Sequence, residues 1–288
     1  MTTATGFGAR VGPAARGHAW FVVRRPGLLL SLVVLALVLL AALVPTLLAD
    51  GDPLVGTPRE RLQGPSAAHL FGTDQLGRDL FTRVVHGSSL SLRATVVAVA
   101  VALVVGGGLG LVAGFVGGWL DAVLMRTVDV VQAIPRLLLS LALVSALGFG
   151  TTKVAIAVGV ASVASFARVM RAEVLRVRSS VYVEAARASG VRSGAILARH
   201  VLPNASGPVF VLAALEFGVA ILSVSALSFL GFGAPPPTPE WGVLIADGRG
   251  FVATAWWLTT FPGLVIAATV LSANRVSRAL DGERRRER

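Results

Sequence analysis

Few residues of this 288-residue chain could perform chemistry, and they form no catalytic motif. Cysteine is absent, which excludes disulfides, thiolate chemistry and cysteine-ligated metals. The single lysine, Lys153, does not complete a Walker A sequence, and neither G-x-S-x-G nor H-E-x-x-H occurs. The histidines are scattered without metal-ligand spacing, at His18, His69, His86 and His200. The chain therefore offers no candidate site for hydrolysis, and we expect it to hold no metal or cofactor of its own.

The composition of the chain indicates a membrane protein. Hydrophobic residues make up 55% and charged residues 14%, against about 25% charged in an ordinary soluble domain. Uncharged runs cover 26–49, 94–120, 217–239 and 250–274, and each exceeds the roughly 20 residues that a helix needs to span the hydrocarbon. The runs lack the alternation of barrel strands, so we expect helices that satisfy their own backbone groups. The predicted fold class is an all-α, polytopic membrane protein.

Six transmembrane helices are predicted, at 27–48, 93–117, 130–149, 152–170, 208–230 and 254–276. The apolar run after Arg24 and Arg25 is longer than the 7–15 residues typical of a signal peptide, so we interpret it as an uncleaved first span. The predicted organisation is an N-terminal tail (1–26), a first span (27–48), a long loop (49–92), a core (93–277) and an Arg-rich tail (278–288). The core contains a polar loop at 171–207.

The distribution of positive charge predicts the orientation of the chain. Its net charge is +11, but the arginines gather in particular loops, which favours membrane topology over nucleic-acid binding. Residues 1–25 carry four arginines and no acid, and 168–199 carries seven arginines against two glutamates, whereas acids and arginines balance in 50–93. We therefore expect both termini and the 171–207 loop in the cytoplasm, and 49–92 and 231–253 outside.

Local signals within the polar loop predict two short helices joined near Gly190. Ser179 or Ser180 can cap the first helix, and Gly190 suits the left-handed position that ends it. Ser193 can cap the second helix, which Pro203 is expected to close. A solvated amphipathic loop with ordinary capping is one interpretation. A DNA-reading helix-turn-helix is another, disfavoured because loops so close to a bilayer rarely reach a groove.

The polar loop also presents a surface suited to a protein partner. Ala185 and Ala186 keep the surface low, so that another protein can approach the backbone, and Glu184 places one negative charge among many arginines. The segment resembles the EAA loop of ATP-binding-cassette importer permeases: Glu-Ala-Ala, three residues, Gly, nine residues, an apolar residue, one residue, then Leu-Pro. The matching residues are Glu184, Ala185, Ala186, Gly190, Leu202 and Pro203. The departure is His200 at the apolar position.

Two further segments are similar to the dipeptide, oligopeptide and nickel branch of this family, in its "C"-type subunit. Phe-Gly-Thr-Asp-Gln-Leu-Gly-Arg-Asp-Leu at 71–80 precedes the second span, and we assign it no chemistry. The proline-rich segment 227–242 is expected to form a stiff external loop, either a gate or binding-protein dock or simply an anchor that ends a helix. The interface is expected to hold the rings of Trp241, Trp256 and Trp257.

The resemblance implies a type I importer permease fold, in a bacterial plasma membrane. It implies a homologous permease as partner, two ATPase subunits that bind ATP and Mg²⁺ and contact the EAA loop, and an external substrate-binding protein. Within a predicted span lies one acid, Glu216, and an intramembrane carboxylate usually faces a partner charge or a cavity. It could contact the amino terminus of a peptide, pair with a subunit, or lie near the cytoplasmic end of its helix.

Two other function classes compete with this interpretation. A stand-alone secondary transporter, driven by protons or sodium, would be expected to show inverted repeats and broken helices with polar groups near mid-membrane. The sequence shows no clear repeat, and Glu216 alone makes a poor proton relay. An intramembrane enzyme would need a catalytic constellation. The resemblance leaves the solute open among dipeptides, longer peptides and nickel chelates.

Overall fold

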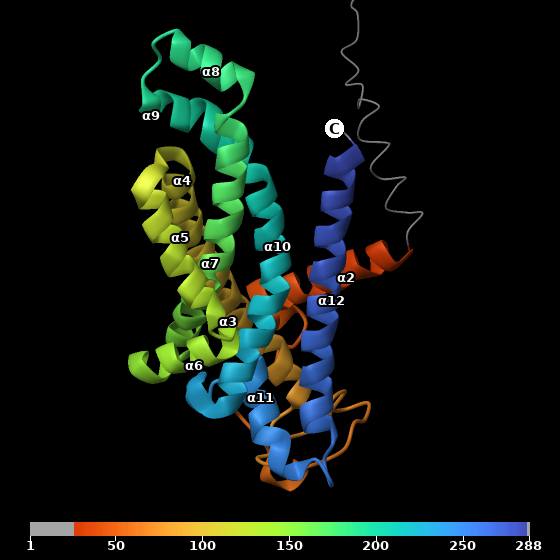
Figure 1. The fold of residues 1–288 in the computed structure, drawn as a ribbon. Helices are drawn as coiled ribbons and strands as arrows, with labels where there is room; N and C mark the ends of the chain where they lie inside the picture. The colour runs from red at the N-terminus through yellow and green to blue at the C-terminus, as the bar shows by residue number, and fades with distance from the viewer. Residues whose placement is uncertain (1–25, 287–288) are drawn as a thin grey trace, which may run out of the picture.

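Long helices run along one axis of the molecule, and no β-strand occurs within residues 26–286, the range that this computed structural model describes, with side chains as far as residue 279 (Figure 1). Along the chain the helices are α2 (Pro26–Leu43), α3 (Leu80–Val101), α4 (Gly107–Val116), α5 (Gly118–Ala133), α6 (Arg136–Leu147), α7 (Thr151–Arg178), α8 (Val181–Ala188), α9 (Ser193–Ile196), α10 (Leu202–Leu227), α11 (Trp241–Gly248) and α12 (Trp257–Arg286). The predicted all-α fold class is confirmed. The predicted tail at residues 1–26 lies outside the described residues except for Pro26, which begins α2.

The number of membrane-spanning elements depends on one broken helix. Among the described residues, five helical stretches are long and apolar enough to span a membrane, and a sixth is counted if α5 and α6 together form one span. These two helices meet at 95°, so the single helix predicted at 130–149 is broken in the structure. The cause is local: proline disfavours helical geometry in the residue before it, and Ile134, which precedes Pro135, is extended at φ −87° and ψ 130°.

Two of the predicted spans are longer in the structure. One helix runs from Leu80 to Val116 through a π-helical segment at Ala102–Gly106, whereas the prediction began at residue 93. The side chain of Asp79 caps this helix by accepting from the Thr82 amide at 2.8 Å. Similarly, α7 continues to Arg178, eight residues past the predicted end at 170. Part of the predicted 171–207 loop is therefore the last two turns of a helix.

Pro203 does not close a helix, contrary to the sequence prediction. The chain stays helical from Ser193 through α9, a π-helical segment at Leu197–Val201, and α10. In the π segment the amide of Leu202 donates to the carbonyl of Leu197, five residues earlier. This change of hydrogen-bond register lies immediately before Pro203, in the first turn of α10, where its missing N–H is tolerated.

Helix α7 lies at the centre of the bundle and packs against α3, α4, α6 and α10. Its contact with α4 and the π-helical segment before it is close because small residues recur every four positions, at Gly106, Gly110 and Gly114. A Cβ added at Gly110 would overlap the carbonyl oxygen of Ala167 on α7. This packing leaves no space for a side chain between the two backbones.

At the end of the molecule shown at the bottom of Figure 1, α3 packs on α11, and the loop between α2 and α3 packs on the start of α12. Trp241 is fully buried and donates from Nε1 to the carbonyl of Val84 at 3.0 Å. Trp257 is also buried and donates to the carbonyl of Thr73 at 3.2 Å. These two rings therefore pack inside the chain and do not face lipid, whereas Trp256 is exposed.

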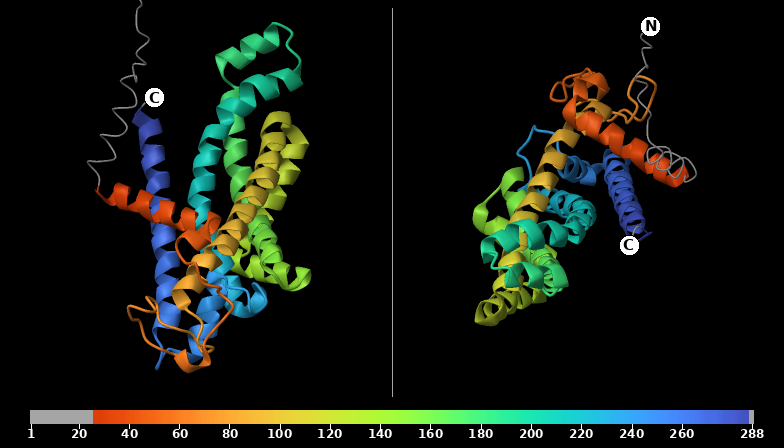
Figure 2. Two further views of the ribbon diagram at one scale, coloured as in Figure 1. Left: turned by 180° about the vertical axis from the view of Figure 1, so that it is seen from behind. Right: turned by 90° about the horizontal axis from the view of Figure 1, so that it is seen from above.

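Helices α8 and α9 lie at the opposite end, at the top of Figure 1, beyond the ends of α4, α5 and α7. The C-terminal end of α12 points toward this same end. Helix α2 instead runs across the other helices and packs against α3 and α12 (Figure 2). The fold therefore has one end built from two short helices and another built from the long loop and α11.

Candidate functional site

Residues 181–203 form a projecting knob, which consists of α8, the turn after it, α9, the π-helical segment and the first residues of α10 (Figure 1). The polypeptide enters the knob from α7 and leaves it into α10, so both connections are helical or nearly so. The helices α7 and α10 also pack against each other. A force on the knob would therefore act directly on two helices of the bundle.

A hydrophobic core holds the knob rigidly on the bundle. Val183 of α8, Ile196 of α9 and Val201 are at most 1% exposed. They belong to one cluster of buried side chains that also contains residues of α7 and α10, namely Phe166, Met170, Val174, Val177, Ala205 and Val209. Because fully buried apolar side chains interdigitate with little free volume, the knob is tightly packed against these helices.

The turn after α8 has the hydrogen bonds of a Schellman motif. Gly190 adopts φ +77°, its amide donates to the carbonyl of Arg187 at 3.0 Å, and the next amide, of Val191, donates to the carbonyl of Ala186 at 3.2 Å. Gly190 is thus in the left-handed conformation that its sequence position suggested. A side chain there would be strained, which explains why glycine fits at this spacing after Glu-Ala-Ala.

The predicted capping residues are only partly in place. Ser180 occupies the N-cap position of α8, but its hydroxyl donates to the carbonyl of Val177 at 2.6 Å rather than accepting from α8. The hydroxyl of Ser179 likewise donates back to α7, to the carbonyls of Leu175 and Arg176. Ser193 is not the cap of α9, because Arg192 occupies that position.

The structure divides the six predicted coupling residues into two groups. Glu184, Ala185 and Gly190 are exposed on the knob, and Ala186 is half-buried beneath them. Leu202 and Pro203 are exposed too, but they lie at the start of α10, and Leu202 lines a cleft with residues of α4. The outer surface of the knob is therefore formed by α8 and its turn, and the Leu-Pro pair lies at its base.

Two exposed apolar residues of the knob escaped the sequence analysis. Val181 is 81% exposed and Tyr182 is 47% exposed, and the ring of Tyr182 lies 6.4 Å from that of His200. An apolar patch with polar neighbours, on a part of a protein that projects from its bundle, is typical of a protein–protein contact. The sequence did carry one indication of this surface: Tyr182, the single tyrosine of the chain, lies two residues before Glu184.

Glu216 on α10 pairs with Arg136, the first residue of α6. Its Oε2 lies 2.7 Å from Nη1 of Arg136, and Nη2 of the same guanidinium donates to Oγ of Ser165 on α7 at 3.1 Å. The Glu216 side chain is 11% exposed and that of Arg136 is 33% exposed. The intramembrane carboxylate thus has a partner charge within its own chain, one that the sequence analysis did not assign.

The proline-rich segment is clasped to the turn between α6 and α7. The amide of Gly150 donates to the carbonyl of Phe232 at 2.9 Å, and the rings of Phe149 and Phe232 stack at 5.6 Å. The fully buried Glu240 accepts from the amide of Ala234 at 3.1 Å through Oε2, while its Oε1 has no hydrogen-bond partner among the described residues. Burial raises the pKa of Glu240. The hydrogen bonds that its carboxylate accepts from the Ala234 amide and the Thr151 hydroxyl lower this pKa, but the effect of burial is larger.

Sequence comparison finds close relatives that cover most of the chain. The chain is 41% identical over 252 residues to the dipeptide transport system permease protein of Alkalihalophilus pseudofirmus, covering 88% of this chain and 83% of that protein. It is 39% identical over 254 residues to the di/tripeptide transport system permease protein of Pseudomonas aeruginosa, covering 86% and 84%. It is 41% identical over 212 residues to the glutathione transport system permease protein of Pectobacterium atrosepticum, covering 74% and 70%.

Structural comparison matches the fold to a solved amino acid ABC transporter, crystallised with histidines, at a TM-score of 0.54 and 16% identity, covering 70% of this chain and 94% of that one. At this identity the match concerns the fold alone. Residues 106–286, which include the knob and α10, match a family of membrane permeases. The chain therefore belongs to the family described as the binding-protein-dependent transport system inner membrane component.

Proposed function

We propose that this chain is the permease subunit of an ATP-driven importer of di- and oligopeptides. The observation that carries the proposal is the knob, which offers Val181, Tyr182, Glu184 and Ala185 to a partner and is rigidly joined to α7 and α10. The peptide class is supported by the names of the dipeptide, di/tripeptide and glutathione permeases to which the chain is similar.

In this proposal the chain works within a complex. A homologous permease completes the translocation path, two ATPase subunits bind ATP and Mg²⁺ and contact the knob, and an extracytoplasmic binding protein delivers the peptide. Both termini and the knob face the cytoplasm, because the arginines gather there and because the knob and the end of α12 lie toward one end of the molecule. The chain itself performs no hydrolysis.

The knob transmits ATPase closure into the membrane as a lever. Because α9 continues into α10, displacement of the knob shifts α10 along its length, and Glu216 carries that shift through Arg136 to the broken helix α6. The clasp between Phe232 and Gly150 joins α6 and α7 to the proline-rich segment, so the movement reaches the external end. Alternating access then follows from the two permeases rocking against each other.

Uptake of a radiolabelled dipeptide tests this function. In cells that lack the chain, its reintroduction should restore uptake that stops when ATP is depleted and survives collapse of the proton and sodium gradients. Unlabelled dipeptides and tripeptides should compete, and a nickel chelate should not. Uptake that follows an ion gradient would replace the proposal with the ion-coupled secondary transporter, and competition by the nickel chelate alone would change the solute class.

A further inference from the structure

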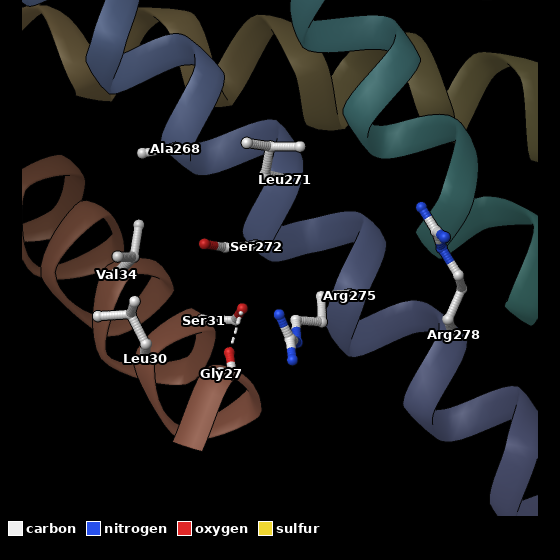
Figure 3. A pocket seen from close by; sticks show the side chains of 9 residues that line it. All are labelled: Gly27, Leu30, Ser31, Val34, Ala268, Leu271, Ser272, Arg275 and Arg278. Atoms are coloured by element: carbon white, nitrogen blue, oxygen red, sulfur yellow. Dashed lines mark hydrogen bonds between the residues drawn. The ribbon is translucent and has the colours of Figure 1, made fainter. Parts of the chain in front are cut away.

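A cleft of about 550 Å³ lies between the first turns of α2 and the C-terminal half of α12 (Figure 3). Its walls are mostly aliphatic, and two buried serines and two exposed arginines supply the polar groups. The apolar wall is formed by Leu30, Val34, Ala268 and Leu271, and the polar groups come from Ser31, Ser272, Arg275 and Arg278. Neither arginine is used by the mechanism proposed above.

The cleft lies where both helices change from apolar to basic. In the sequence, Arg24 and Arg25 precede the uncharged run that begins at Pro26, and Arg275 follows the uncharged run that ends at Asn274. The structure brings these two boundaries together, because the guanidinium of Arg275 lies so close to Gly27 that a Cβ at Gly27 would overlap it. A change from apolar to basic residues marks the level of the lipid headgroups on the side that is rich in arginine.

The two arginines are available to an added anion. Neither Arg275 nor Arg278 forms an ion pair with any side chain in the part of the chain that the structure describes, and both are exposed. Figure 3 shows the Arg275 side chain pointing toward the first turn of α2, whereas the Arg278 side chain points away from α2, toward the neighbouring helix α10. A phosphate beside Arg275 would complete a site whose remaining wall is apolar, and Arg278 adds a second positive charge at the rim.

We propose that this cleft binds a phospholipid with an anionic headgroup. Arg275 holds the phosphate and Arg278 adds a second positive charge at the rim, while an acyl chain lies along Leu30, Val34 and Leu271. The cationic rim and the aliphatic wall match the two halves of such a lipid, whereas inorganic phosphate would use only the first. The site also gives α2, which crosses the bundle and buries little of its own surface, a lipid-mediated contact with α12.

Native mass spectrometry of the full chain, purified with whatever subunits accompany it, tests the site. Phosphatidylglycerol and phosphatidylcholine of identical acyl composition are titrated separately. Wild type should bind phosphatidylglycerol in preference, and Arg275→Gln/Arg278→Gln should weaken that binding by about fivefold for each arginine. Arg275→Lys/Arg278→Lys should retain the preference, and so should Arg249→Gln, which removes an exposed arginine beyond the other end of α12.

A second variant protects the test against misfolding. Leu30→Trp/Leu271→Trp leaves both arginines in place but fills the apolar wall, and it should weaken phosphatidylglycerol binding while leaving the ATPase contact unchanged. Equal binding of the two lipids, or an unchanged preference in the glutamine variant, would overturn the proposal. So would millimolar inorganic phosphate that displaces the lipid completely, or a photocrosslinker on Leu271→Cys that captures a protein subunit instead of lipid.

Discussion

Nη1 of Arg136 lies 2.7 Å from Oε2 of Glu216, and this ion pair joins two residues that are 80 positions apart in sequence. Arg136 starts α6 directly after the break at Pro135, while Glu216 lies within α10, the helix that continues from the knob. The pair therefore holds the broken helix against the helix that continues from the knob. In the proposed mechanism, this position would let Glu216 pass a movement of the knob on to α6.

The ion pair should be needed for both stability and transport. Glu216→Gln or Arg136→Gln leaves one partly buried charge without its partner, and each should cost about 2 kcal/mol, less than the full penalty of a deeply buried pair. For a domain of this size that is roughly a 5 °C fall in Tm. Thermal unfolding in detergent measures the effect. Because Arg136→Glu/Glu216→Arg restores opposite charges, it should recover part of the loss; a double variant no better than the singles would argue against the pair.

The close packing of α4 on α7 can be tested with two glycines two residues apart. Gly110→Ala places a methyl group against the carbonyl oxygen of Ala167, so the helices must separate, at a cost of about 1–3 kcal/mol. Gly108→Ala is the matched control, because nothing lies within 4 Å of the added Cβ, and alanine should stabilise the helix slightly. Equal Tm values for the two variants would show that the packing is looser than described.

The buried Glu240 should make stability depend on pH. Burial raises its pKa above the ordinary 4.5, so the folded chain favours the neutral acid. This contribution to stability is complete below pH 4.5 and is lost as the pH rises through the folded-state pKa. Glu240→Gln keeps an acceptor for the Ala234 amide without a charge, and it should therefore flatten the fall in Tm between pH 4.5 and pH 8.

Two other carboxylates help to interpret that pH profile. Burial also raises the pKa of Asp247, although Arg83 and Arg78 oppose the shift, so the glutamine variant should retain a smaller dependence of the same sign. Asp50 is exposed, so Asp50→Asn should leave the profile unchanged. A Glu240→Gln profile that parallels the wild type would mean that Glu240 is charged in the folded protein.

The turn of the knob should discriminate between residues at Gly190. Its φ of +77° makes Gly190→Ala unfavourable by about 1 kcal/mol, whereas asparagine tolerates this conformation and Gly190→Asn should cost less. Hydrogen exchange of the Val191 amide, which donates to Ala186, reports on the turn. Gly194→Ala is the control, because its Cβ would meet nothing within 4 Å. Faster exchange in that control than in Gly190→Ala would contradict the assignment.

Much of the bundle could be predicted from local sequence, and the errors have physical causes. Uncharged runs identified most of the spans, but a helix end can carry charge when that charge is buried. Arg83, near the start of α3, is only 1% exposed, and its burial is compensated by the nearby carboxylates of Asp74 and Asp247. A prediction based on uncharged runs places such a charged residue in a loop. The break at Pro135 carried a visible signal that the span prediction did not use.

The candidate site was predictable only where its geometry is local. The spacing from Glu184 to Gly190 lies within one helix and its turn, so a sequence pattern can specify it. The exposure of Tyr182 and the pairing of Arg136 with Glu216 depend on neighbours from distant segments. An apolar residue on a short helix can point inward, as Val183 does, or outward, as Val181 does, and only the packing decides between them.

Recovery of the ATPase is the most direct test of the coupling surface. The wild-type chain, Glu184→Lys and Gly190→Arg are each purified from native host membranes in mild detergent, together with Asp50→Lys, a charge reversal at an exposed acid outside the knob. We expect wild type and Asp50→Lys to bring down equal amounts of a nucleotide-binding subunit. Either knob variant should recover about tenfold less, corresponding to about 1.4 kcal/mol of contact energy. Full recovery with Glu184→Lys and Gly190→Arg, or a folded wild-type chain that recovers no ATPase, would contradict the account.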